Sequence, residues 1–192
     1  MKKKPIITFN SPVILSFVLI CFIATLLGVI SGGTITKLLF MTGRSSPKNP
    51  LTYIRLFTHV FGHSGWEHFI GNATYLLLLG PMLEEKYGPK ILTEIIAFTA
   101  LITALIHLIL FPHAALCGAS GVVFAFIVLA SFTGFKDGEI PLTFILVVVI
   151  FIGQQIFEGL TIQDDISNTG HIIGGAVGSV TGYLLNKKKI RD

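Results

Sequence analysis

Long apolar runs alternate with short polar stretches along this chain, and the pattern predicts membrane-spanning helices. Six runs approach the ~20 residues that an α-helix needs to cross the hydrocarbon core of a bilayer. Proline, glycine or charged residues flank each run. The runs cover residues 12–31, 66–84, 91–111, 117–134, 141–159 and 168–186. The sequence therefore predicts an all-α polytopic membrane protein, a bundle of six transmembrane helices.

The segment between the first two predicted helices, about residues 32–65, is long and unusually apolar for a loop. Its last part reads LTYIRLFTHVFGHSGW and contains Tyr53, Phe57 and Phe61. Aromatic side chains are enriched at membrane–water interfaces. We therefore expect this first loop to lie at the membrane interface or to pack on the bundle.

The first apolar run follows MKKKP and has a second interpretation, a secretory signal peptide. Its apolar stretch is longer than the ~7–15 residues of a signal-peptide core, and no clear A-x-A cleavage site follows it. The run is therefore interpreted as a spanning helix.

Composition supports a chain embedded in lipid. Of the 192 residues, 52% are hydrophobic and only 12% are charged, about half the charged share of a soluble domain. The net charge of +4 comes from basic residues gathered near the two ends and not from one patch, so nucleic-acid binding is not implied. Cys21 and Cys117 provide neither a disulfide framework nor a CxxC metal pair.

Charge predicts the orientation. With both ends in the cytoplasm, as six spans require, ten Lys and Arg residues lie inside and four outside, which agrees with the positive-inside rule. The inner residues are Lys2, Lys3, Lys4, Lys86, Lys90, Lys136, Lys187, Lys188, Lys189 and Arg191, and the outer ones are Lys37, Arg44, Lys48 and Arg55. We expect a basic cytoplasmic N-terminus (1–11), a membrane domain (12–186) and a basic cytoplasmic tail (187–192).

Four polar residues fall inside the predicted spans, where polar side chains are costly and mark function by default. His68 and Asn72 are four residues apart and therefore share one helix face. With Ser120 and His171, they all lie near the outer end of their spans. Each has a structural explanation when taken alone: a hydrogen bond between helices for the first two and for His171, and small-residue packing for Ser120.

Glycines explain how two of these residues could meet. Gly118 and Gly121 flank Ser120, although the stretch is not the GxSxG elbow of soluble hydrolases, because residue 122 is valine. Gly174, Gly178 and Gly182 form a smooth face below His171. Close approach of these helices would bring the imidazole within about 3 Å of the Ser120 hydroxyl, the distance that general-base catalysis requires.

Five motifs between residues 54 and 182 carry a family resemblance. They are IRLFTH at 54–59, His68-x-x-x-Asn72, Gly80-x-x-x-Glu84-x-x-x-Gly88, GASG at 118–121, and His171 with the glycines after it. The combination resembles the rhomboid family of intramembrane serine proteases, in its small six-helix bacterial form.

The resemblance implies an intramembrane serine endopeptidase with Ser120 as nucleophile and His171 as general base. Asn72, with His68 and the Ser120 backbone N–H, would form the oxyanion hole. No aspartate lies within a predicted span, so a dyad and not a triad is implied.

The resemblance extends to the setting of the reaction. Arg55 and Glu84 would be structural residues, no metal or organic cofactor is needed, and the substrates would be single-pass transmembrane proteins. A six-span chain without a transit peptide favours a bacterial plasma membrane, with the site opening to the outer side. The oligomeric state and the helix that admits substrate stay open.

Other classes of protein fit the sequence less well. A metal site built on His59, His63 and His68 lacks the HExxH pattern, and an aspartyl protease needs two embedded aspartates. A non-proteolytic rhomboid-like protein that binds membrane helices would not require Ser120 and His171. A transporter or channel would need polar groups along a full path. For His107, near the outer end of the third span, a structural hydrogen bond is expected.

Overall fold

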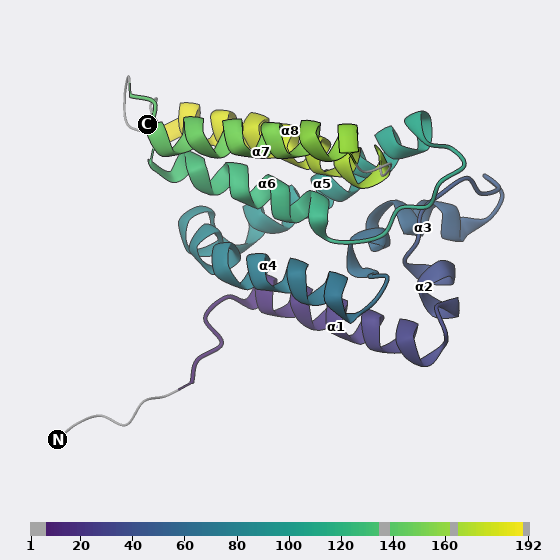
Figure 1. Ribbon diagram of the computed structural model, residues 1–192. Helices are drawn as coiled ribbons and strands as arrows, with labels where there is room; N and C mark the ends of the chain where they lie inside the picture. Colours follow the sequence, from purple (N-terminus) through teal and green to yellow (C-terminus); the bar gives the residue numbers. More distant parts are fainter. Residues whose placement is uncertain (1–6, 135–138, 162–164, 190–192) are drawn as a thin grey trace.

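The computed structural model describes residues 7–134, 139–161 and 165–189. This part of the chain folds into eight α-helices and two short 3₁₀ helices (Figure 1), with an isolated bridge between Thr42 and Leu116 and no longer strand. The elements are α1 (Pro12–Ile30), α2 (Thr34–Leu39), α3 (Pro50–Thr58), η1 (His59–Phe61), α4 (Trp66–Tyr87), α5 (Pro89–Leu110), α6 (Ser120–Ser131), η2 (Phe132–Gly134), α7 (Leu142–Thr161) and α8 (Asp165–Lys189). The prediction of an all-α protein is confirmed.

Five predicted runs correspond to α1, α4, α5, α7 and α8, but the fourth begins later than expected. Helix α6 starts at Ser120 and not at residue 117. Gly118 has a φ of +128°, which is incompatible with a right-handed helix. The serine is therefore the first residue of its helix.

Two of the described helices, Pro12–Ile30 and Pro89–Leu110, are long and apolar enough to cross a membrane. Helix α6 is apolar but has 12 residues, which span about 18 Å of the ~30 Å hydrocarbon core. The count of six spans therefore remains a prediction.

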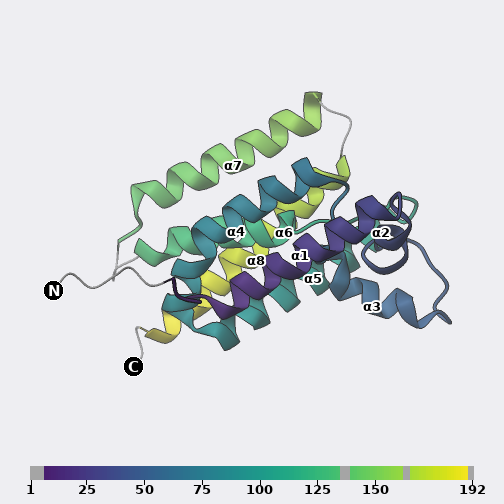
Figure 2. The same cartoon turned by 90° about the horizontal axis from the view of Figure 1, so that it is seen from below.

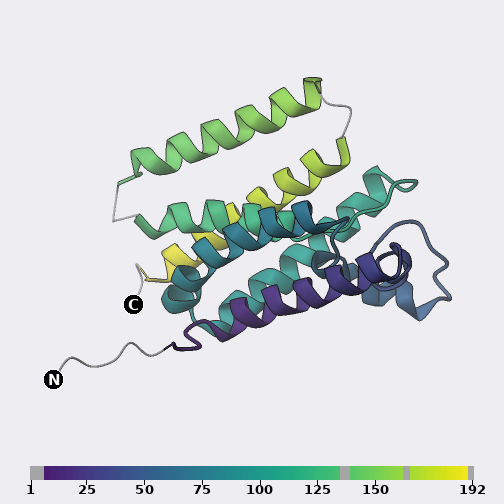
Figure 3. The ribbon, with the colours of Figure 1, turned by 60° about the horizontal axis from the view of Figure 1, so that its bottom comes forward.

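Helix α6 lies at the centre of the bundle, where it contacts α4, α5, α7 and α8. Its most extensive contact is with α8. Helix α7 lies at the edge (Figures 2 and 3), and among the described residues its main contacts are with α6 and α8. The small helices α2 and α3 gather at the end of the bundle where α1 ends and α4 begins.

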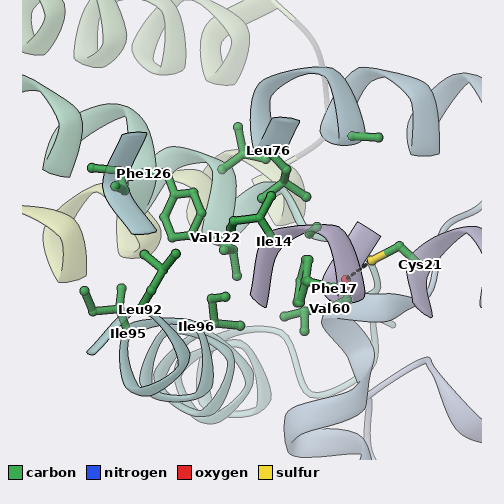
Figure 4. Packing of buried hydrophobic residues seen from close by; sticks show 14 of the residues in the cluster. Ile14, Phe17, Cys21, Val60, Leu76, Leu92, Ile95, Ile96, Val122 and Phe126 are labelled. Carbon is green, nitrogen blue, oxygen red and sulfur yellow. Dashed lines mark hydrogen bonds between the residues drawn. The ribbon is translucent and has the colours of Figure 1, made fainter. Parts of the chain in front are cut away.

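The buried core joins α1, α4, α5 and α6 (Figure 4). Ile14, Leu76, Leu92, Val122 and Phe126 are among its fully buried side chains, each no more than 1% exposed. Burying one such side chain contributes about 1.5–3 kcal/mol. This core packs α4 against α6.

Large apolar side chains also cover the outward faces of the bundle. Leu78 on α4 is 69% exposed and Ile109 on α5 is 76% exposed, and Phe22 and Val29 on α1 are also exposed. A helix that is apolar both inside and outside is typical of a membrane span or of the core of a large protein. The bundle thus has the surface of a lipid-embedded protein.

The start of α1 is held by α4. The Glu84 carboxylate, 5% exposed, accepts hydrogen bonds from the Val13 amide at 3.0 Å and the Ile14 amide at 3.1 Å. These amides belong to the first turn of α1, whose N–H groups lack intrahelical partners. In the first loop, Arg55 Nε donates to the Leu38 carbonyl at 2.7 Å and so ties α3 to α2.

Candidate active site

The chain before Ser120 is extended, and the first loop holds it in place. Thr42 and Leu116 exchange two backbone hydrogen bonds of 2.9 and 2.8 Å. The Gly118 amide donates to the His59 carbonyl at 2.9 Å. Ser120 follows as the first residue of α6, where backbone N–H groups have no partner within the helix and the dipole favours negative charge. The hydroxyl therefore lies beside amides suited to an oxyanion.

The imidazole of His68 lies against the backbone of Gly118. A Cβ atom on Gly118 would come within 2.7 Å of His68 Cε1 and 2.8 Å of Nε2, so this position requires glycine for both space and φ. On its other side, His68 Nδ1 forms a 3.1 Å hydrogen bond with Ser64 Oγ. Asn72 Nδ2 donates to the His68 carbonyl at 3.0 Å, and its side chain is 7% exposed.

Helix α8 approaches α6 backbone to backbone. A Cβ atom on Gly174 would lie 2.8 Å from the carbonyl carbon of Gly121, and one on Gly178 would lie 2.9 Å from Ala125 Cα. Farther along, a Cβ on Gly182 would meet the Phe132 ring at 2.5 Å. These glycines allow the two helices to touch along most of α6.

His171 lies one turn before this glycine contact, and its ring packs on Phe124. The two ring centroids are 4.1 Å apart, with an interplanar angle of 36°. Phe124 follows Ser120 by four residues and therefore shares its face of α6. The imidazole is thus held on the side of α6 that carries the serine.

A cavity of about 620 Å³ lies between α4, α6, α7 and α8, and Ser120, His171, His68 and Asn72 all line it. The remainder of the lining is mostly apolar and includes Phe124, Ile127, Val147 and Ile150. The structure therefore brings all four of these residues to one cavity, although they come from three helices.

Three further polar residues line this cavity, and sequence reasoning gave none of them a role. They are Glu67 and Tyr75 on α4 and Gln154 on α7. Glu67 and Tyr75 are eight residues apart, two turns along one face of the helix. Tyr75 follows Asn72 by three residues and therefore shares its face of α4, which was the available signal for Tyr75 but not for Glu67 or Gln154.

A much smaller cavity, about 10 Å³, lies on the inner side of Ser120 and is bounded by His59, Thr99, Thr103 and Gly170. Oγ1 of Thr99 and of Thr103 is buried without a hydrogen-bond partner within the described structure. A space of this size between polar groups is about large enough for one water molecule. Ser120 thus lies between an open cavity and a closed polar one.

The histidines of the first loop are buried and neutral. Burial lowers the pKa of His59 to about 4, and burial with a smaller contribution from nearby His68 lowers the pKa of His63 to about 4. Their Nδ1 atoms donate to the carbonyls of Arg55 at 3.3 Å and Phe61 at 3.2 Å. Within the described ranges, no group of three or more His, Cys, Asp or Glu side chains is placed to hold a metal ion.

His107 also serves the loop that precedes the serine. It is 2% exposed, and its Nε2 donates to the Ala114 carbonyl at 3.1 Å. The ring lies 5.8 Å from that of Phe111. This hydrogen bond links the end of α5 to the segment 111–116.

In chemical terms, the larger cavity combines a hydroxyl, an imidazole and several hydrogen-bond donors. A hydroxyl becomes a nucleophile when an adjacent base accepts its proton. Amide and imidazole N–H groups stabilise the negative charge that develops on an attacked carbonyl oxygen. The arrangement is suited to acyl transfer.

Comparison with known proteins identifies a matching family and two relatives. A family model described as the Rhomboid domain matches residues 50–188. The chain is 24% identical over 149 residues to Rhomboid-like protein 11, chloroplastic, of Arabidopsis thaliana, a match that covers 70% of this chain and 53% of that protein. It is 28% identical over 140 residues to Rhomboid-related protein 1 of Caenorhabditis elegans, covering 68% and 39% respectively. The chain thus spans about half the length of these relatives or less.

Proposed function

The chain belongs to the rhomboid family, which implies a membrane protein, and we propose that it is an intramembrane serine endopeptidase. The observation that carries the proposal is the shared cavity, which Ser120, His171, His68 and Asn72 line together. Its substrates are single-pass transmembrane proteins, cut within or near the spanning helix.

In the proposed reaction, Ser120 Oγ attacks a substrate peptide carbonyl while neutral His171 accepts the hydroxyl proton. The imidazolium then gives this proton to the leaving amine, and water releases the acyl group from the serine by the same route. A positioned base of this kind contributes about 10²–10⁴-fold to the rate. The contact of His171 with Phe124 supports the role, because a packed ring has few alternative rotamers.

The oxyanion forms next to the start of α6. The Ser120 amide, Asn72 Nδ2 and the His68 ring supply the donors. The side-chain amide of Asn72 has two N–H groups, and one of them already donates to the His68 carbonyl, which leaves the second for the substrate. Loss of one such donor costs about 10²–10³ in kcat.

The proposed topology has six spans with both termini in the cytoplasm of a bacterial cell and the cavity open to the outer side of the plasma membrane. The ten-to-four distribution of basic residues supports it. The domain boundaries proposed with it are 1–11, 12–186 and 187–192. A cavity that faces outer water supplies the hydrolytic water that lipid excludes.

The test uses purified protein in detergent with a single-pass reporter helix. Wild type is compared with Ser120→Ala, His171→Ala and Asn72→Ala, each with and without a chelator, and Ser120 is labelled with a fluorophosphonate. We expect cleavage and labelling in wild type that the chelator does not change, loss of both in Ser120→Ala, and a 10²–10³-fold slower rate in Asn72→Ala.

The opposite results separate the alternatives. Cleavage that persists in Ser120→Ala would assign the activity to another nucleophile or to a contaminant. A wild-type protein that binds the reporter helix but neither cuts it nor reacts with the fluorophosphonate would be a non-proteolytic member of the family.

A further inference from the structure

Helix α4 carries a carboxylate at the outer end of the cavity. Glu67, Gly71 and Tyr75 follow one another every four residues and line the same wall. Among the described residues that line the cavity, Glu67 is the only acidic residue, and none is Lys or Arg. It also belongs to the first turn of α4, where the helix dipole favours negative charge.

This carboxylate is available to a ligand. Glu67 is exposed, and within the described structure no hydrogen bond or ion pair engages it. Glu84, on the same helix, shows the contrast: its two oxygens accept hydrogen bonds from the start of α1. Glu67 has no comparable part in holding the fold together.

The cavity also changes in character along its length. From Glu67 to Tyr75, α4 rises about 12 Å. Gln154 lies in the second half of α7 (Leu142–Thr161), whereas Val147 lies near the start of that helix. A bound segment therefore meets a carboxylate at the outer end and apolar side chains farther in.

We propose that Glu67 is a specificity determinant, which favours substrates with a Lys or Arg close to the cleaved bond on its water-facing side. The inference rests on the proposed protease function. Glu67 and Ser120 line the same cavity, so a peptide bound there for attack by Ser120 can place a neighbouring side chain beside the Glu67 carboxylate. A basic side chain can lay its apolar stem along the cavity wall and place its charge beside Glu67. An acidic side chain in the same place is repelled.

The expected effect is modest, because the carboxylate is exposed to water. An exposed ion pair corresponds to a preference of about 1.4- to 5-fold in kcat/KM. Salt screens such pairs, with a Debye length of about 10 Å at 0.1 M and 3 Å at 1 M. The preference should therefore decline as salt is raised.

The experiment measures kcat/KM in detergent for reporter helices that differ at one residue. Lys, Gln or Glu is placed in turn at each of four positions on either side of the cleaved bond. Wild type, Glu67→Gln and Glu67→Lys are compared, and Glu85→Gln serves as a matched control, because this exposed carboxylate lies at the opposite end of α4 and outside the cavity. Fluorophosphonate labelling of Ser120 reports the intact site in each variant.

At one or two positions, wild type and Glu85→Gln should prefer Lys over Gln by about 1.4- to 5-fold and disfavour Glu. Glu67→Gln should abolish the preference, and Glu67→Lys should reverse it. If all four proteins show the same Lys, Gln and Glu ratios at every position, the inference is overturned while the protease assignment stands. If wild type neither cleaves nor is labelled, the proposed function is wrong and the inference falls with it.

Discussion

The approach of α8 to α6 can be tested with one methyl group. In Gly174→Ala, the new Cβ would lie 2.8 Å from the carbonyl carbon of Gly121, and closer still to its oxygen, whereas ordinary contacts begin at 3.4 Å. Helix α8 must therefore move away by at least about 0.6 Å. Overpacking of this kind lowers the free energy of unfolding by about 1–3 kcal/mol. His171 moves with the helix, because it lies one turn before Gly174.

Both consequences can be measured. A loss of 1 kcal/mol lowers Tm by about 2–4 °C in a chain of this length, so thermal unfolding in detergent should show a decrease of about 2–12 °C. A misplacement near 1 Å can cost about 10²-fold in rate, so we expect reporter cleavage to slow by about 10- to 100-fold. The matched control is Gly153→Ala on α7, where nothing lies within 4 Å of the added Cβ. Because alanine favours helix by about 1 kcal/mol, this variant should be as stable as wild type or more so.

One outcome would refute the reasoning. If Gly174→Ala unfolds at the wild-type temperature and cleaves at the wild-type rate, the two backbones do not touch as described. A decrease in Tm without a change in rate would keep the contact but separate it from the placement of His171.

Three further predictions follow from contacts of the structure. Glu84→Ala should lower the free energy of unfolding by about 1.5–3 kcal/mol or more in chemical denaturation, because two charge-assisted hydrogen bonds to α1 are lost, whereas Glu85→Ala should change it by less than about 0.5 kcal/mol. Gly118→Ala should abolish fluorophosphonate labelling, because the Cβ needs the space of the imidazole that packs there; labelling at the wild-type rate would contradict this contact. His59 and His63 have folded-state pKa values near 4, below the ordinary 6.5, so the unfolded chain binds more protons as the pH falls below 6.5. Tm should accordingly be unaffected by these two groups above about pH 6.5 and should fall toward pH 4, with a shallower slope in the His63→Gln variant; equal slopes would argue against the burial.

Local pattern determined the helices of this chain. Apolar runs of about 20 residues, bounded by Pro, Gly or charged residues, predicted α1, α4, α5, α7 and α8 to within a few residues. The prediction works because a helix in apolar surroundings needs apolar residues in every turn. The helices of the first loop were harder to predict, although the apolar character of the loop was visible. Helices α2 and α3 are short, and their packing on the bundle stabilises them more than their own helix propensity does.

The candidate site likewise contains residues that the sequence predicted and residues that only the structure revealed. Polar groups are rare in spans, so Ser120, His171, His68 and Asn72 stood out in the sequence. The charge of the loops predicted a common depth for them. The other residues that line the cavity with these four could not be predicted from the sequence. Glu67 on α4 and Gln154 on α7 line one cavity, although the two helices are far apart in the sequence and no local rule relates these residues.

Only the tertiary structure showed that α6 begins at Ser120. Apolar character continues from residue 117, so periodicity alone extends the helix through Gly118. The pairing of Leu116 with Thr42, 74 positions earlier in the chain, keeps the segment extended, and the His68 ring occupies the space beside Gly118. Composition and spacing show which residues prefer an apolar environment and which prefer water. The start of α6 depends instead on contacts between segments that are distant in the sequence, and these contacts form only when the bundle has folded.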